Sequence, residues 1–216
     1  MDAELIQVFE ESAQEYDAWF DRNRLVYESE ISALKRFLVS GVRGLEIGVG
    51  TGRFAVPLGI EVGVEPAAAM AVIAQRRGIK VFRAVAESLP FRGDSFDLVV
   101  MVTVLCFLRD PFLSLAEATR VLKPGGQILM GMIDKDSPLG QSYEAHKQES
   151  KFYRQARFYS VSQALGWLGK LAYKKVETCQ TILKPLREIV GFEPVKDGHG
   201  EGGFVVIAGQ KEGGSE

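Results

Sequence analysis

The sequence predicts one α/β domain, built on a mostly parallel sheet with helices on both sides. Two observations lead to this fold class. Short apolar runs alternate with helical segments through the central part of the chain, which is the pattern of parallel strands joined by helices. The runs are apolar on both faces, as buried parallel strands are. A chain of 216 residues suits one sizeable domain better than two.

Two helices are expected ahead of the first strand. Between residues 3 and 21, apolar side chains recur at helical spacing among acidic ones. A second helix is predicted from about Tyr27 to Leu38, because Ile31 and Leu34 fall on one face with Leu38.

Strands and helices then alternate. Five apolar runs are predicted strands: "VRGLEIG", "IEVGVEP", "IKVFRAV", "FDLVVMVTVL" and "GQILMGMI". A helix over "AAAMAVIAQRRG" would end at Gly78. Another would begin at Asp110-Pro111, since Asp is a good N-cap and Pro a good first helical residue, and it would end at Pro124-Gly125.

The C-terminal third predicts one amphipathic helix over "VSQALGWLGKLAYKK" and two strands, "VETCQTIL" and "FVVIAGQ". A turn-rich segment, "KPLREIVGFEPVKDGHGEGG", separates the two strands. Two closing strands joined by such a hairpin-like excursion would end the sheet antiparallel.

Composition narrows the function classes. Hydrophobic residues make up 46% and charged residues 25%, with a net charge of −2, so no global attraction to nucleic acid or an anionic membrane is expected. Cys106 and Cys179 are far apart, so neither a disulfide framework nor a metal site is expected. No apolar run approaches the ~20 residues that span a bilayer, and the N-terminus has no secretory h-region. We expect a cytoplasmic protein.

The stretch "GLEIGVGTGRF" is the first candidate site. A glycine-rich turn after a strand brings backbone N–H groups close to a ligand. A phosphate-binding P-loop would need Lys after its last glycine, but Arg53 follows Gly52. A dinucleotide motif fits Gly48 and Gly50, yet its third glycine should be residue 53. The spacing therefore disfavours a dinucleotide without excluding it.

Glu46, two residues before Gly48, favours a different ligand. A carboxylate beside a pyrophosphate is repelled by on the order of 1 kcal/mol or more, whereas an ammonium is attracted. S-adenosylmethionine carries an ammonium, a sulfonium, a carboxylate and a ribose. The backbone amides of Gly48, Val49, Gly50 and Gly52 can face its carboxylate, with Glu46 near its ammonium.

Four segments carry a family resemblance: "LEIGVGTGRF", "VGVEPA", "AVAESLPFRGDSFDLVVMVTVL" and "EATRVLKPGGQIL". In this order and spacing, they resemble the class I S-adenosylmethionine-dependent methyltransferases, in particular the quinone-biosynthesis and small-molecule subgroup. The resemblance covers residues 40 to 133, and continues more loosely through "ARFYSVSQALGWL".

The resemblance implies a Rossmann-like three-layer sandwich, with a seven-stranded sheet whose last strand is antiparallel. It divides the single domain, 1–216, into four parts. These are N-terminal cap helices (1–40), a cofactor-binding core (41–133), a substrate lid with a helix (134–175) and the closing strands (176–210).

The resemblance also implies roles for residues beyond the glycine turn. Glu65 would bind the ribose hydroxyls, Pro66 or Met70 would pack against the adenine, and Thr103 would lie beneath the methionine moiety.

One segment departs from the family pattern, which reads Gly-Asp-Ala-Glu before Leu-Pro-Phe. Here Val85 stands in place of the Asp that, in the family, accepts from the adenine amino group, so adenine recognition is expected to depart from the family pattern. Ala86 still offers a backbone N–H, and Glu87 is a candidate replacement.

For the methyl acceptor, the segment "EYDAWF" resembles a helix that closes over the cofactor, which makes Tyr16 and Trp19 candidates. His146 and Tyr153 lie in the expected lid, although core packing or a surface position explains such residues equally well. Acidic residues on the first helix favour an amine acceptor, while lysines and arginines in the lid favour an anionic one.

The sequence thus predicts an enzyme that transfers a methyl group from S-adenosylmethionine to a small or medium-sized molecule. Two alternatives stay open: an NAD(P)-dependent oxidoreductase and a non-catalytic S-adenosylmethionine-binding module. A nucleic-acid acceptor is not expected, because the [DN]-P-P-[YF] motif of base-amino methylation is missing after the fourth strand. The catalytic residue, the acceptor atom and the oligomeric state stay unassigned.

Overall fold

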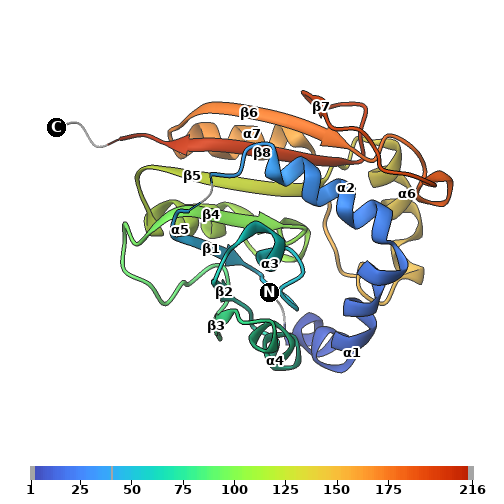
Figure 1. The fold of residues 1–216 in the computed structure, drawn as a ribbon, viewed down its shortest axis with the longest axis horizontal. Coiled ribbons are helices and arrows are strands. Elements are labelled where there is room, and N and C mark those ends of the chain that lie inside the picture. The colour runs from blue at the N-terminus through green and yellow to red at the C-terminus, as the bar shows by residue number, and fades with distance from the viewer. Residues whose placement is uncertain (1–2, 40, 214–216) are drawn as a thin grey trace.

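A mixed sheet of eight strands lies between two layers of helices in the computed structural model, which describes residues 3–39 and 41–213 (Figure 1). The strands are β1 (Gly44–Ile47), β2 (Val62–Val64), β3 (Lys80–Phe82), β4 (Phe96–Val102), β5 (Leu122–Ile133), β6 (Tyr173–Thr181), β7 (Lys196–Asp197) and β8 (Phe204–Lys211). Their order across the sheet is β3-β2-β1-β4-β5-β8-β6-β7. Strands β1 to β5 pair in parallel, while β8 runs antiparallel to both β5 and β6.

The helices are α1 (Ala3–Arg22), α2 (Arg24–Lys35), α3 (Ala55–Leu58), α4 (Ala68–Arg76), α5 (Pro111–Val121), α6 (Pro138–His146) and α7 (Val161–Lys170), with the 3₁₀ turns η1 (Leu105–Phe107), η2 (Lys147–Glu149) and η3 (Leu186–Glu188). Local chemistry fixes several of their starts. Asp110 caps α5 by accepting from the Leu113 N–H, and Ser160 forms a capping box with Gln163 at α7. No helix in the described ranges is long and apolar enough to cross a membrane.

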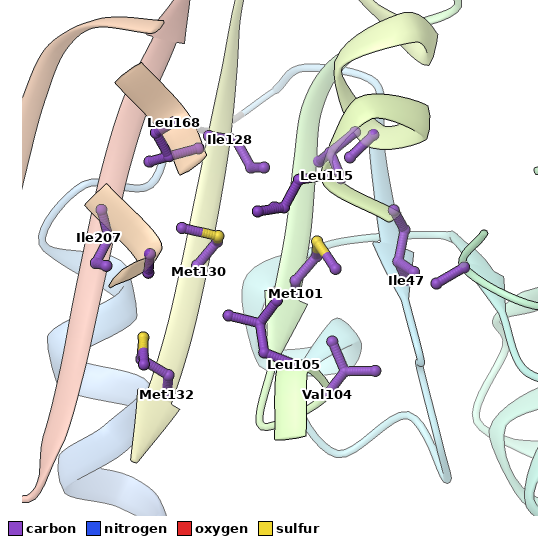
Figure 2. Close-up of a cluster of buried hydrophobic side chains, with 14 of the residues drawn as sticks. Ile47, Met101, Val104, Leu105, Leu115, Ile128, Met130, Met132, Leu168 and Ile207 are labelled. Carbon is purple, nitrogen blue, oxygen red and sulfur yellow. The ribbon is translucent and has the colours of Figure 1, made fainter. Parts of the chain in front are cut away.

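The core has one cluster on each face of the sheet. Alternate residues of β4 point to opposite faces, so Met101 packs with α5 and α7 while Val100 packs with α2 and α3. Figure 2 shows the first cluster, to which β4 contributes Met101, β5 contributes Met130 and α7 contributes Leu168. These apolar layers hold the strand ends in fixed positions.

The predicted α/β class and its mostly parallel sheet are confirmed. The expected strand number, seven, is wrong by one. The extra strand is β7, two residues of the turn-rich segment that pair with Cys179 and Gln180 of β6. The last helix is also shorter than predicted. It ends at Lys170, because Ala172 turns the chain with φ +57° and Tyr173 already belongs to β6.

Helix α1 covers the carboxyl ends of the parallel strands, where open α/β sheets bind ligands. It packs beside α4 (Figure 1), and a third apolar cluster joins Leu5, Phe9 and Ala13 of α1 to Ala67 and Met70. Helix α1 contains a kink at Ser12, whose φ and ψ are −123° and 18°. The chain therefore brings an N-terminal helix to the position where the sequence predicts the site.

Candidate functional site

The glycine turn connects β1 to α3 through three left-handed residues, Gly48, Gly50 and Gly52, with φ of +72°, +54° and +84°. A Cβ atom built at Gly48 would lie 2.5 Å from Val104 Cγ2, so close packing excludes a side chain there. A Cβ built at Gly50 would meet Met70 Cε at 3.6 Å and Tyr16 Cε1 at 3.8 Å. The Gly50 backbone thus faces a space that α1 and α4 border.

That space is a cavity of about 30 Å³, here called the glycine-loop cavity. It is lined by Phe9, Tyr16, Gly48, Gly50, Glu65, Met70, Val102, Thr103, Val104 and Phe107. The lining comes from α1, the glycine turn, the end of β2, α4 and the end of β4.

Glu65 ties the glycine turn to the start of α4. Its Oε2 accepts from the Gly50 N–H at 3.0 Å, and its Oε1 accepts from the Ala67 N–H at 2.8 Å. Burial raises the pKa of Glu65 to about 7, although these two hydrogen bonds oppose the rise. A carboxylate has about four acceptor sites, so each oxygen can accept a further hydrogen bond.

Glu46 is buried beneath the same turn, with 1% of its surface exposed. Its Oε2 atom has no hydrogen-bond partner among the residues that the structure describes. Burial raises the pKa of Glu46 well above its usual value, and the charge of Glu65 raises it further. A cationic group beside Glu46 would relieve both effects.

Thr103, directly after β4, has φ +48° in the left-handed region that a β-branched residue rarely adopts. Its backbone N–H donates to Gly131 O on β5 at 2.8 Å, which holds this conformation. Thr103 borders the glycine-loop cavity and a larger aromatic cavity, described next. Strained residues of this kind are typical of functional sites.

The aromatic cavity has a volume of about 260 Å³. Its walls come from α1, α2, α6, the ends of β4 and β5, and the segments around η2 and η3. The lining residues are Glu15, Tyr16, Trp19, Phe20, Arg22, Val26, Glu30, Phe54, Thr103, Phe107, Ile133, Leu139, Tyr143, Ser150, Lys151, Phe152, Tyr153 and Leu186. Tyr16, Thr103 and Phe107 line both cavities, so the two adjoin.

Glu30 is a carboxyl group in the wall of the aromatic cavity that sequence reasoning missed. The residue is 8% exposed, and burial raises its pKa to about 8. A signal for it exists in the sequence, because Val26, Glu30 and Leu34 share one face of α2 and both apolar members are buried. A charged residue on the apolar face of a helix is an informative exception.

Ion pairs attach α1 to the glycine turn. Arg53 donates to both oxygens of Asp17, at 2.9 and 2.8 Å, and Arg77 donates to the same carboxylate at 2.6 and 2.8 Å. Although burial acts to raise the pKa of Asp17, hydrogen bonds from Arg77 and Arg53 hold it well below its usual range. Arg53 also pairs with Asp21.

Three of the acidic residues of α1, which favour an amine acceptor on sequence grounds, are engaged by other groups of the protein. Asp17 binds the two arginines, and Glu15 pairs with Lys151 at 2.6 Å. Glu10 accepts from the backbone N–H groups of Ala68 and Ala69 at the start of α4. These contacts hold α1 against the glycine turn, α4 and the segment after η2.

The structure brings most of the expected cofactor residues together. Gly48, Gly50, Glu65, Met70 and Thr103 line one cavity, with Glu46, Val49 and Gly52 in the adjacent strand end and turn. Pro66, Ala86 and Glu87 lie outside that lining. The Pro66 carbonyl accepts from Arg83, Ala86 is buried in the core on the α5 side, and Glu87 accepts from the Arg109 N–H at 3.0 Å.

The four expected acceptor residues separate into two groups. Tyr16, Trp19 and Tyr153 line the aromatic cavity. His146 is exposed and lines a neighbouring groove of about 780 Å³, where its Nδ1 lies 2.8 Å from Ser142 O. Burial raises the pKa of the Cys106 thiol to about 12, which suits a structural thiol rather than a nucleophile.

Groups of three or more His, Cys, Asp or Glu placed to hold a metal ion are not found in the described part of the chain.

Residues 45–130 match the family model described as a methyltransferase domain. An uncharacterized protein of Methanocaldococcus jannaschii is 50% identical over 206 residues, which cover 95% of this chain and 100% of that one. A ubiquinone/menaquinone biosynthesis C-methyltransferase of Xanthomonas oryzae is 29% identical, over 92% of this chain and 81% of that one.

Among solved structures, a protein of Thermotoga maritima has a TM-score of 0.92 and 46% identity, covering 95% of this chain and 99% of that chain. It is described as an S-adenosylmethionine-dependent methyltransferase and a possible histamine N-methyltransferase.

Proposed function

Because the chain belongs to the class I S-adenosylmethionine-dependent methyltransferases, we propose that it methylates a small-molecule amine held in the aromatic cavity. S-adenosylmethionine is the cofactor, and when bound it supplies a methyl group made electrophilic by the sulfonium. The protein's part is to align the acceptor with that methyl group and to exclude water.

The residues at the glycine turn fit this cofactor. The unpartnered Oε2 of Glu46 suits an ammonium, and the open acceptor sites of Glu65 suit ribose hydroxyls. Gly50 leaves its backbone accessible from the glycine-loop cavity, where Met70 offers an apolar surface for the adenine. These assignments support cofactor binding at the end of β1 and β2.

The observation that carries the proposal is the common wall of the two cavities. Tyr16, Thr103 and Phe107 border both, so an acceptor in the aromatic cavity lies beside the cofactor site. At about 260 Å³, the aromatic cavity is smaller than the ~300–1,000 Å³ pockets that hold drug-sized ligands. This volume supports a small acceptor.

The chemistry of the cavity wall supports an amine. Aromatic rings attract ammonium groups through cation–π interactions, and aromatic side chains supply much of this lining. Glu30 adds a carboxyl group, which would ionise beside an ammonium and pair with it, but which offers no favourable charge to a carboxylate or phosphate. The support thus comes from α2 rather than from the acidic residues of α1.

The oxidoreductase alternative lacks support at the site. Arg53 stands where a dinucleotide motif has its third glycine, and its guanidinium is committed to Asp17 and Asp21. Methyl transfer to any acceptor would exclude the alternative of a non-catalytic binding module.

A labelled-methyl assay tests the proposal. The purified protein is incubated with S-adenosylmethionine and matched panels of small amines, phenols, thiols, carboxylic acids and hydroquinones. We expect transfer to one or more amines. Transfer to a hydroquinone or a carboxylic acid alone would refute the amine acceptor. Binding of S-adenosylhomocysteine without transfer to any panel member would favour the non-catalytic module.

A further inference from the structure

Glu30 is a carboxyl group without local compensation. No described residue donates a hydrogen bond to it or forms an ion pair with it, in contrast with Asp17 and Glu65. It is nevertheless 92% buried and borders the aromatic cavity together with Thr103. A buried carboxyl group without a hydrogen-bond or ion-pair partner destabilises the fold. Such groups in a cavity are typical of functional sites, where they act on a bound molecule.

An amine reaches the enzyme mainly as an ammonium, which has no lone pair and cannot accept a methyl group. We propose that Glu30 accepts the proton that the amine must lose before methylation, an inference that rests on the proposed function. Glu30 is then a catalytic residue that touches the acceptor, a role that no motif in the sequence indicated.

The proton balance of this step is simple. The Glu30 carboxylate takes one proton from R–NH₃⁺, which gives a carboxylic acid and R–NH₂. The freed lone pair forms the new N–C bond as the S–C bond to the methyl group breaks, and the electron pair of that bond stays on sulfur. The product leaves as R–NH₂–CH₃⁺, and Glu30 returns its proton to water.

The cavity favours this proton transfer. Low-polarity surroundings stabilise the neutral form of both partners, so they raise the pKa of a carboxyl group and lower that of an ammonium. Burial raises the pKa of Glu30 to about 8. This value is much closer to the pKa of an alkylammonium than the pKa of an exposed carboxyl group is. A general base is most effective when its pKa is near the working pH.

Six other charged or titratable residues line the same cavity. They are Glu15, Tyr16 and Arg22 of α1, Tyr143 of α6, and Lys151 and Tyr153 after η2. Burial raises the pKa of Tyr143 to about 12 and also raises those of Tyr16 and Tyr153, so these phenols stay neutral. Glu15 and Lys151 pair with each other.

The test is the pH profile of kcat/KM at saturating S-adenosylmethionine, for two amines that differ in pKa. In the wild type, the reactive complex contains a carboxylate and an ammonium, so the acidic limb should stay near the pKa of Glu30 for both amines. In Glu30→Gln, each amine must arrive neutral, so the acidic limb should move to the pKa of that amine. At pH 7 the variant should lose roughly tenfold or more in kcat/KM.

Glu28→Gln is the matched control, because Glu28 lies on the same helix but pairs with Arg24 in solvent. It should keep the wild-type profile. The variants share Glu46 and Glu65, so titration at the cofactor site is common to all profiles. Affinity for S-adenosylhomocysteine should be unchanged in Glu30→Gln, which separates loss of proton transfer from loss of the fold.

Should Glu30→Gln fail to fold, calorimetry of the wild type measures the same event. An amine that binds the S-adenosylhomocysteine complex at pH 7 should release about one proton to the buffer, and this release should disappear above the pKa of Glu30. Equal proton release at both pH values would overturn the inference.

The two proposals fail differently. If the wild type methylates no amine but does methylate another class, the proposed function is wrong. If the wild type methylates amines and Glu30→Gln keeps both the rate and the acidic limb, the function stands and the role of Glu30 is wrong.

Discussion

Arg53 of the glycine turn and Asp17 of α1 are joined by two side-chain hydrogen bonds, 2.9 and 2.8 Å long, across 36 residues of sequence. Arg77 at the end of α4 binds the same carboxylate. The helix that lines both cavities is thereby fixed to the loop that forms the floor of one of them. Changes at this pair should affect the cofactor site as well as stability.

Asp17→Asn should lower the free energy of unfolding by about 1.5–3 kcal/mol, because two guanidinium groups lose a charged partner. It should also lower the affinity for S-adenosylhomocysteine. Calorimetry of unfolding and of binding measures the two effects. Asp21→Asn is the control, since its side chain is 70% exposed against 17% for Asp17 and should matter little. Because the pKa of Asp17 is depressed, its contribution is present above the usual Asp range and is lost as the pH falls through the lowered value. An Asp17→Asn protein with native stability and affinity would contradict this account.

Glu65→Ala should weaken binding of S-adenosylhomocysteine by roughly 1.5–3 kcal/mol for each charged hydrogen bond to ribose that is lost. The variant also leaves the Gly50 and Ala67 N–H groups without their acceptor. Titration calorimetry measures the change. Glu61→Ala, an exposed carboxylate just before β2, is the control. Equal affinity of the wild type and Glu65→Ala would remove Glu65 from the site.

Gly50→Val should abolish cofactor binding while the circular dichroism spectrum stays close to native. The added side chain would enter the glycine-loop cavity beside Met70 and Tyr16, at a residue whose φ is +54°. Gly166→Ala is a suitable comparison, because an added Cβ there has nothing within 4 Å and lies on α7, away from the glycine turn. Normal binding by Gly50→Val would place the cofactor elsewhere.

Glu30→Gln should change how stability depends on pH. A carboxyl group with an ordinary pKa of 4.5 and a folded pKa of about 8 keeps its proton in the folded chain after the unfolded chain has lost it. Its contribution to stability is full below pH 4.5 and is lost as the pH rises through about 8, whereas Gln does not titrate. Between pH 4.5 and 9 the wild type should therefore lose on the order of 4 kcal/mol relative to the variant. Urea unfolding at pH 5 and 8.5 measures this, and parallel behaviour of the two proteins would contradict the burial of an uncompensated carboxyl.

The parts of the fold that periodicity determines were predictable. The apolar runs around Leu45 and Val99 became buried parallel strands because a strand covered on both faces needs apolar side chains throughout. Strand β7 was not predictable, because two residues carry no period and their pairing depends on β6. Local sequence equally could not assign a partner to Asp17, because ion pairs across 36 residues depend on tertiary structure.

The candidate site also contains residues that could be predicted from the sequence and residues that could not. The glycine turn and Glu65 lie near one another in sequence, so their approach to one another was foreseeable. Glu30 was missed because it stands beside Glu28 in a helix that seemed ordinarily amphipathic. The distinction lies in the helical spacing. Glu30 shares a face of α2 with the buried Val26 and Leu34, whereas Glu28 lies off that face and pairs with Arg24.

The wall shared by the two cavities makes their ligands thermodynamically linked. About 30 Å³ has room for about one water molecule, so a nucleoside can enter the glycine-loop cavity only when side chains that line it change position, and Tyr16 of α1 is one of these lining residues. A movement of Tyr16 would also reshape the aromatic cavity, because Tyr16 borders that cavity too. Whatever factor the cofactor introduces into the affinity for the acceptor, the acceptor must introduce into the affinity for the cofactor. Calorimetry of each ligand in the presence and absence of the other measures this reciprocity.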